Sequence, residues 1–159
     1  MLFRSSGLRL GEQDYETFLN GADPEYKWQM PADEWQAMCL NYTSGTSGRP
    51  KGVVYHHRGA YLMAMGTIPV WNMPMHPTYL YVVPLFHCNG WGHAWMMAIV
   101  AGTTICCRKI IAEDIYPLIT DHKVTHFGGA PIVLSMLVNA PDDVIKKPEH
   151  TVNIMTAGA

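Results

Sequence analysis

A run rich in glycine and small hydroxyl side chains, followed by a lysine, is the part of the sequence best suited to bind phosphate groups. It covers residues 40–52 and reads LNYTSGTSGRPKG. Glycine adopts backbone angles closed to other residues, so successive N–H groups can converge on one anion. Hydroxyl groups add donors and the lysine adds a mobile positive charge. The residues expected to hold phosphate are Thr43, Ser44, Gly45, Thr46, Ser47, Gly48 and Lys51.

This run differs from the P-loop of ATPases and GTPases, G-x-x-x-x-G-K-[ST]. Pro50 stands where that motif needs glycine, and Gly52 stands where it needs serine or threonine. The residues that follow, at 53–55, are β-branched or aromatic, which favours a strand over a helix. We therefore expect a phosphate loop between two strands. The alternative is a polar Gly/Ser turn with no ligand, which such compositions often form.

Four stretches together carry a resemblance to a known family. Residues 40–51 resemble the AMP-binding signature of the adenylate-forming enzymes, and PLFHCNGW at 84–91 resembles the motif beside the acyl pocket of fatty acyl-CoA synthetases. FGGAP at 127–131 and TAGA at 156–159 follow in the order that this family has. The resemblance runs from about residue 40 to the last residue and is nearest to the medium-chain acyl-CoA synthetases.

The resemblance implies a fold, a reaction and a set of ligands. The fold would be α/β, a partial N-terminal domain of the adenylate-forming fold with a mostly parallel sheet and flanking helices. The reaction would be ATP-dependent activation of a carboxylic acid, expected to be a fatty acid, through an acyl-adenylate to acyl-CoA. ATP, Mg²⁺ and CoA would take part. The family's magnesium glutamate, ribose aspartate and C-terminal lysine have no match up to residue 159, so we expect an internal fragment that is inactive alone.

The same resemblance assigns roles near the acid. His87 would be catalytic, near the carboxylate and the α-phosphate, and would also contact substrate. Trp91 would line or gate the acyl tunnel. The small residues Gly128, Gly129 and Ala130 would form a wall of the acyl pocket, and Gly158 and Ala159 would approach adenine. A hydrogen-bonded core histidine and a core aromatic side chain are the alternative interpretations of His87 and Trp91.

Hydrophobic periodicity and turn residues predict the order of elements. Residues 1–35 are expected to be a helix and a linker, and residues 36–159 a partial AMP-binding domain. Strands are expected at 35–42, 53–56, 79–83, 103–107, 124–127 and 153–156. Helices are expected at 12–21, 57–67, 90–100, 112–122 and 131–139. Alternation of strands and helices favours a parallel sheet, whose ligands bind at the carboxyl ends of strands.

Charge and composition narrow the class of protein. The 159 residues carry a net charge of −2, which gives no reason to expect a nucleic-acid partner. All 13 carboxylates lie outside residues 35–112, a stretch with five Lys or Arg, which suits polyanions or reflects buried elements. The four cysteines lack zinc-site spacing and the eight histidines contain no HExxH, so no metal site is expected. No segment reads as a membrane span, and we expect a cytoplasmic or organellar-matrix protein.

Two other functions stay open at this point. The chain could be a nucleotide- or acyl-binding module without catalysis, or part of a peptide-synthetase adenylation domain. The FHCNGW stretch at 86–91 fits the fatty acyl type better. A homodimer of the parent protein is compatible with the resemblance. Acyl chain length does not follow from the sequence.

Overall fold

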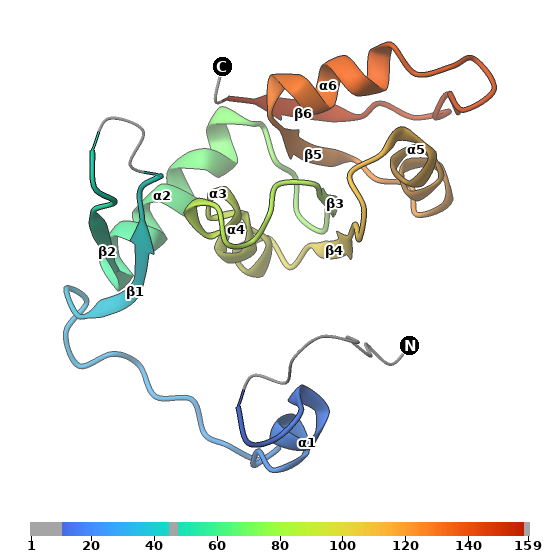
Figure 1. Ribbon diagram of the computed structural model, residues 1–159. Helices are drawn as coiled ribbons and strands as arrows, with labels where there is room; N and C mark the ends of the chain where they lie inside the picture. Colours follow the sequence, from blue (N-terminus) through green and yellow to red (C-terminus); the bar gives the residue numbers. More distant parts are fainter. Residues whose placement is uncertain (1–10, 45–47, 158–159) are drawn as a thin grey trace. The chain divides into compact units, whose positions relative to one another are not determined.

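The computed structural model describes residues 11–44 and 48–157 (Figure 1). The chain divides into two compact units, residues 1–31 and 32–159. In the first unit, α1 (Tyr15–Asn20) begins where Asp14 accepts a hydrogen bond from the Thr17 N–H at 2.9 Å. This cap satisfies an N–H that has no partner within the helix. The helix ends at Gly21. The domain boundary expected at 35/36 stays a prediction.

The glycine-rich run joins two strands, as predicted. Strand β1 (Ala37–Tyr42) and strand β2 (Gly52–His56) pair antiparallel, with Tyr42 opposite Gly52 at the loop end. They form a two-stranded sheet separate from the main one. The chain then enters α2 (His57–Val70) directly, and the His56 side chain caps this helix by accepting from the Gly59 N–H at 3.0 Å.

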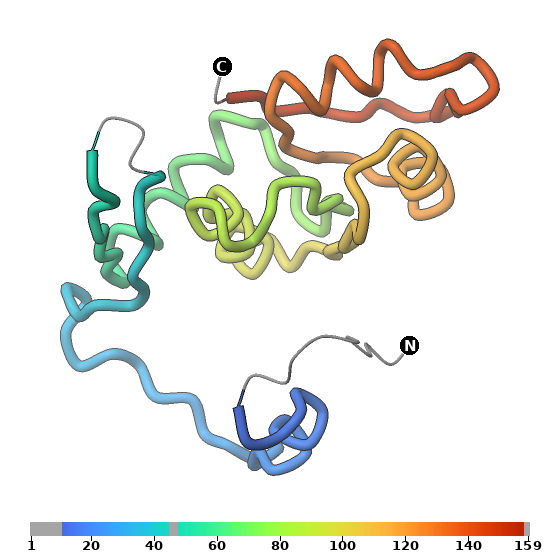
Figure 2. The backbone as a smooth tube through the Cα atoms, viewed as in Figure 1, coloured from blue at the N-terminus to red at the C-terminus, as the bar shows by residue number. Residues whose placement is uncertain are grey.

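The main sheet has four parallel strands, in the order β4-β3-β5-β6. The path of the chain through these strands can be followed by colour along the tube in Figure 2. Their bounds are β3 (Thr78–Tyr81), β4 (Thr103–Cys106), β5 (His126–Gly129) and β6 (Asn153–Thr156). The expected parallel α/β architecture is therefore confirmed. The carboxyl ends of β3, β5 and β6 lie at one edge of this sheet, where α/β proteins bind ligands.

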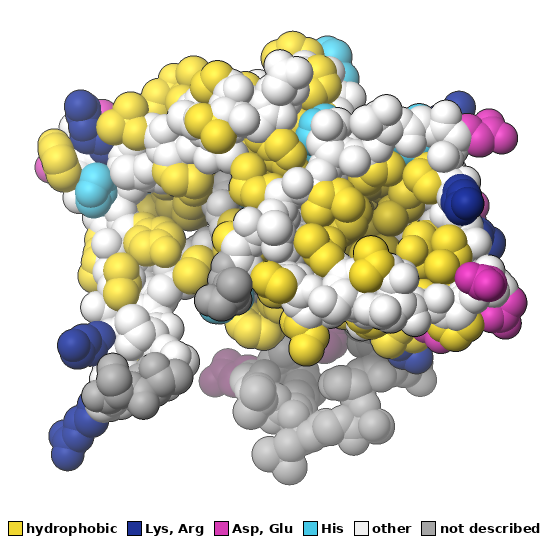
Figure 3. All heavy atoms as spheres, turned by 90° about the horizontal axis from the view of Figure 1, so that it is seen from above, with side chains coloured by type: hydrophobic (Ala, Val, Ile, Leu, Met, Phe, Trp, Pro, Cys, Tyr) yellow, Lys and Arg dark blue, Asp and Glu magenta, His cyan; other side chains and the backbone are white. Residues whose placement is uncertain are grey.

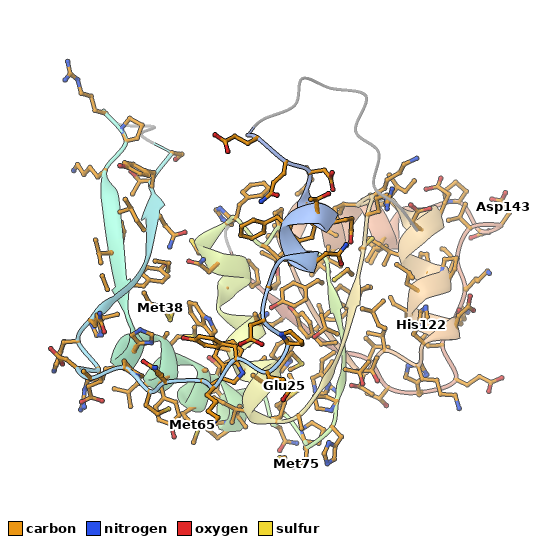
Figure 4. The ribbon with its side chains drawn as sticks, turned by 90° about the horizontal axis from the view of Figure 1, so that it is seen from below. Glu25, Met38, Met65, Met75, His122 and Asp143 are labelled. Carbon is orange, nitrogen blue, oxygen red and sulfur yellow. The ribbon has the colours of Figure 1, made fainter. Side chains whose placement is uncertain are left out.

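Helices cover both faces of the sheet. The side chains of β3 point alternately to the two faces, so each face has apolar side chains that a helix can bury. Leu80 packs with Phe127 and with α5 (Ala112–Asp121) and α6 (Pro131–Val138). Tyr79 and Tyr81 pack on the other face with α2 and α4 (His93–Ile99). Each face thus has its own hydrophobic cluster. The side chains are drawn in Figure 4, with Met65 labelled on α2 and His122 at the end of α5.

Two predicted elements were wrong in ways that concern the site. The helix expected at 90–100 is broken into α3 (Cys88–Trp91) and α4, with Gly92 between them at φ 68°. Gly128 and Gly129 were expected to follow the end of a strand, but both lie within β5 and are buried. The other predicted strands and helices are present, with ends shifted by a few residues.

Candidate functional site

The described ends of the glycine-rich loop are held together by Thr43 and Lys51. The Thr43 N–H donates to the Lys51 carbonyl at 3.0 Å, and the Lys51 N–H donates to the Thr43 hydroxyl oxygen at 3.0 Å. The hydroxyl proton of Thr43 is left to donate elsewhere. Ser44, Gly48 and Lys51 are exposed, and Gly48 has φ 157°, a conformation that favours glycine. The hydroxyl-bearing residues Thr43 and Ser44 and the charged residue Lys51 are thus exposed together at the end of the hairpin.

Five predicted binding residues fall outside the described part of the chain. They are Gly45, Thr46 and Ser47 in the loop, and Gly158 and Ala159 at the end. Their roles stay predictions.

Four of the five residues expected to contact the acid line one pocket of about 190 Å³. His87 and Trp91 line it from the segment after β3, while Gly129 and Ala130 line it from the end of β5. Ala157, directly after β6, closes a further side. The parallel sheet explains this meeting, because strands far apart in sequence end side by side. Gly128 lies just behind the pocket, in van der Waals reach of the Trp91 ring.

Residues 88–92, which follow His87, are wound left-handed. The φ angles are 47° at Cys88, 48° at Asn89, 61° at Gly90, 57° at Trp91 and 68° at Gly92. Hydrogen bonds from the Gly90 N–H to the His87 carbonyl (2.9 Å) and from the Gly92 N–H to the Asn89 carbonyl (3.1 Å) close the turn. Left-handed helical backbone costs roughly 1–2 kcal/mol per residue that is not glycine. Such strain persists only where surrounding contacts enforce it.

The space left by Gly128 is filled by aromatic rings. A Cβ at this position would lie 3.2 Å from both His93 Cε1 and a ring carbon of Trp91. At Gly129 the nearest atoms to a Cβ are 3.7 Å away, an ordinary contact. Gly128 therefore admits the close approach of Trp91 and His93 to strand β5, whereas Gly129 leaves room.

A buried Tyr79–His93 pair, which was not expected from the sequence, supports these rings. The Tyr79 phenol oxygen lies 2.5 Å from His93 Nδ1 and accepts the Gly128 N–H at 3.2 Å. Burial raises the pKa of Tyr79 well above its usual range and lowers the pKa of His93 to about 4. Both groups are neutral at pH 7, so the phenol donates to Nδ1 and the imidazole proton sits on Nε2. No local pattern in the sequence indicates this pair, because β3 and α4 come together only in the folded domain.

Trp91 also borders a larger hollow of about 370 Å³ toward α2. Its lining includes Met63, Gly66, Thr67 and Val70 of α2 together with His93 and Met155. These side chains are apolar apart from Thr67 and His93. No binding residue was expected on α2 from the sequence, because periodicity alone does not distinguish a helix face that lines a pocket from one that lies in the core.

Hydrophobic side chains are widespread on the face seen in Figure 3, and the charged ones lie toward its edges. Arg49 and Lys51 are exposed at the loop, in the stretch of the chain that has no Asp or Glu. This balance fits the polyphosphate of a nucleotide, which the loop's hydroxyl and backbone donors also suit. It does not favour a Mg²⁺ site at the described ends of the loop, because Mg²⁺ prefers carboxylate oxygens. Within the described residues, no three His, Cys, Asp or Glu side chains are grouped to hold a metal ion.

None of the helices among the described residues has the length and apolar character needed to cross a bilayer.

Comparison with known proteins now adds to this geometry. The model of the AMP-binding enzyme family matches residues 6–159. The chain belongs to the AMP-binding enzyme family. It is 52% identical over 153 residues to the peroxisomal acetate/butyrate–CoA ligase of Arabidopsis thaliana. The matched residues make up 96% of this chain and 27% of the relative. It is 50% identical over 153 residues to an acetate–CoA ligase of Humulus lupulus, with the same shares. The chain thus spans about a quarter of the length of these relatives.

Two solved structures share the fold. The N-terminal domain of FACL13 from Mycobacterium tuberculosis superimposes with a TM-score of 0.80 at 24% identity, over 91% of this chain and 36% of that one. O-succinylbenzoate CoA synthetase from Bacillus subtilis, solved with ATP and magnesium ion, gives a TM-score of 0.77 at 24% identity, over 90% of this chain and 30% of that one. The α/β arrangement expected from the resemblance is that of part of an adenylate-forming N-terminal domain.

Proposed function

We propose that this chain is part of an acid–thiol ligase that activates a carboxylic acid with ATP and transfers the acyl group to CoA. The observation that carries the proposal is the meeting of His87, Trp91, Gly129 and Ala130 in one pocket at the strand ends of an AMP-binding domain. The names of the relatives support the reaction, since both are CoA ligases. Mg²⁺ would come with ATP and bind to residues outside this chain.

The chemistry requires a carboxylate and a triphosphate, both negative, to come together. A carboxylate oxygen attacks the α-phosphorus, the bond from that phosphorus to the bridging oxygen breaks, and pyrophosphate leaves. The CoA sulfur then attacks the acyl carbon, its thiol proton is lost, and AMP leaves with the bonding electrons. Donors on the loop, with Lys51, would take up charge on the β- and γ-phosphates. His87 would donate toward the carboxylate or the α-phosphate.

The acid is proposed to be small and aliphatic. Acetate, butyrate and 2-methylpropanoate are the acids in the names of relatives that are 50–52% identical to this chain. The pocket of about 190 Å³ beside His87 supports a short chain, while the 370 Å³ hollow beyond Trp91 would admit a longer one. A longer fatty acid is therefore the competing substrate class, because the sequence resembles the medium-chain acyl-CoA synthetases most.

The test is acid-dependent exchange of labelled pyrophosphate into ATP. The full-length ligase would be assayed with straight-chain acids from acetate to decanoate, and product acyl-CoA would be identified by mass spectrometry. Exchange and acyl-CoA with short acids are the expected result. Binding of ATP without exchange for any acid would indicate a binding module instead. Exchange with amino acids alone would favour a peptide-synthetase adenylation domain.

An organellar location is proposed over a cytoplasmic one. Two relatives, 52% and 46% identical, have peroxisomal in their names. Imaging the full-length protein fused to a fluorescent protein at its N-terminus, beside a peroxisomal marker, tests this. A diffuse signal would contradict it.

A further inference from the structure

The left-handed turn at residues 88–92 is fastened to the hairpin that carries the glycine-rich loop. Asn89 Oδ1 accepts a hydrogen bond from Asn41 Nδ2 at 2.6 Å and one from Cys39 Sγ at 3.3 Å. Asn41 Nδ2 also lies 3.7 Å from Cys39 Sγ. Both partners are on β1, and the three side chains are partly buried. A side chain within the strained turn is thus bound to the strand that leads into the loop.

The second strand of the hairpin also reaches this turn. Tyr55 of β2 and Cys88 line the same pocket of about 330 Å³, together with Trp91. Tyr55 also contacts Trp95 of α4, with ring centroids 6.4 Å apart. The Tyr55 side chain is also hydrogen-bonded to the Cys88 side chain. The hairpin therefore contacts the turn from both strands, and β1 does so through the amide of Asn89.

The conformation of the turn fixes the positions of His87 and Trp91. His87 precedes the first left-handed residue, and Trp91 is inside the run, so a change of φ at Asn89 would swing both relative to the pocket. Asparagine adopts this region more readily than most residues, and its amide can be fixed by outside partners. Asn89 meets both conditions. Its backbone is held left-handed, while its side chain is hydrogen-bonded to residues of β1.

We propose that Asn89 is a positioning residue that, through Asn41, holds His87 and Trp91 toward the pocket and couples acid binding to phosphate binding at the loop. The inference rests on the proposed function, because it assigns the acid and the phosphates to these two places. Phosphates bound at Thr43 and Lys51, which close the end of the hairpin, would restrain β1 and Asn41, and hence the turn. An acid that packs against Trp91 would restrain the turn, and hence the contact between Asn89 and Asn41, from the other side. By linkage, each ligand then raises the affinity for the other by the same factor.

The experiment separates the side chain from the backbone at position 89. Asn89→Gly removes the amide and keeps the left-handed backbone free of strain, whereas Asn89→Ala removes the amide and adds strain. Asn41→Ala removes only the partner. For the full-length ligase and each variant, isothermal titration would give the Kd of the acid with and without an ATP analogue carrying an α,β-methylene bridge. The ratio of the two Kd values measures the coupling.

The unaltered ligase should bind acid about five- to fiftyfold more tightly with the analogue present, within the range of known couplings. In Asn89→Gly and Asn41→Ala this ratio should fall toward one, and the double variant should lose no more than either single variant. A ratio of one in the unaltered protein, or the same ratio in all variants, would overturn the proposal. A general loss of stability would instead weaken acid binding equally with and without the analogue.

Asn72 offers the matched control. It is an exposed asparagine with φ 50°, just past the end of α2. Asn72→Ala and Asn72→Gly should leave the coupling ratio unchanged. A readout independent of catalysis is hydrogen exchange of residues 85–95, which should speed up in Asn41→Ala; unchanged exchange would overturn the role of the Asn41 contact. If the unaltered ligase shows no pyrophosphate exchange with any acid, the proposed function fails. Hydrogen exchange of residues 85–95 still tests the contact between Asn41 and Asn89 in that case.

Discussion

The Tyr79 phenol donates to His93 Nδ1 across 2.5 Å, behind the glycine against which Trp91 packs. The same phenol oxygen accepts the Gly128 N–H. One side chain therefore ties strand β3 to the first residue of α4 and to strand β5. Because His93 is buried and neutral, this contact makes the stability of the domain depend on pH.

Stability should fall as the pH drops from about 6.5 to about 4. Burial lowers the folded pKa of His93 to about 4, so in this window the unfolded chain binds a proton that the folded chain does not. Unfolding is therefore favoured by acid, by roughly 3 kcal/mol across the window. His126, whose pKa is also lowered by burial, adds an effect of the same sign.

Urea unfolding at intervals between pH 4 and 7 measures this dependence. His93→Gln keeps a group that can accept the phenol proton but does not titrate, so its unfolding free energy should depend less on pH. His122→Gln, at an exposed position just past α5, is the control and should behave as the unaltered protein. Equal pH dependence in His93→Gln and the unaltered protein would contradict a lowered pKa at His93.

Gly128→Ala should disturb the pocket more than Gly129→Ala. The added Cβ at 128 would lie 3.2 Å from both His93 and Trp91, and two packed rings would have to move. Overpacking of this kind costs roughly 1–3 kcal/mol. At 129 the nearest atoms are 3.7 Å away. We expect a lower thermal midpoint and a higher KM for acid in Gly128→Ala, and near-normal values in Gly129→Ala. Equal effects of the two changes would show that the close approach at 128 has no consequence.

Local sequence patterns were enough to predict the two strands on either side of the loop, the parallel sheet and most helices. Val53 to Tyr55 favour a strand by residue type, and Pro131 stands at the first turn of α6, where proline is tolerated. The left-handed turn was missed because Trp91, Trp95 and Met96 have helical spacing. Their spacing gives no sign that Asn89 is bound to Asn41 from 48 positions earlier. The Tyr79–His93 pair was missed for the same reason, since only the folded sheet brings the two together.

Trp91→Ala should change which acids the ligase prefers. Trp91 lines both the pocket beside His87 and the hollow toward α2, so removing its ring would join the two spaces. Longer acids should then gain relative to short ones, by up to about 0.8 kcal/mol for each buried methylene. The measurement is kcat/KM for acids of increasing length. A fall in stability with an unchanged length profile would make Trp91 a core residue only.

Lys51→Met should slow formation of the acyl-adenylate more than it weakens acid binding. The Lys51 backbone is already bonded to Thr43 in both directions, so the substitution removes a charge at the loop while the hairpin stays paired. A hydrogen bond to a charged group contributes roughly 1.5–3 kcal/mol, which corresponds to a loss of about ten- to a hundredfold in pyrophosphate exchange. Lys109→Met is the matched control, because Lys109 is exposed in the same carboxylate-free stretch but follows β4. If both variants keep the exchange rate and the KM for ATP of the unaltered ligase, Lys51 has no part in binding the phosphates.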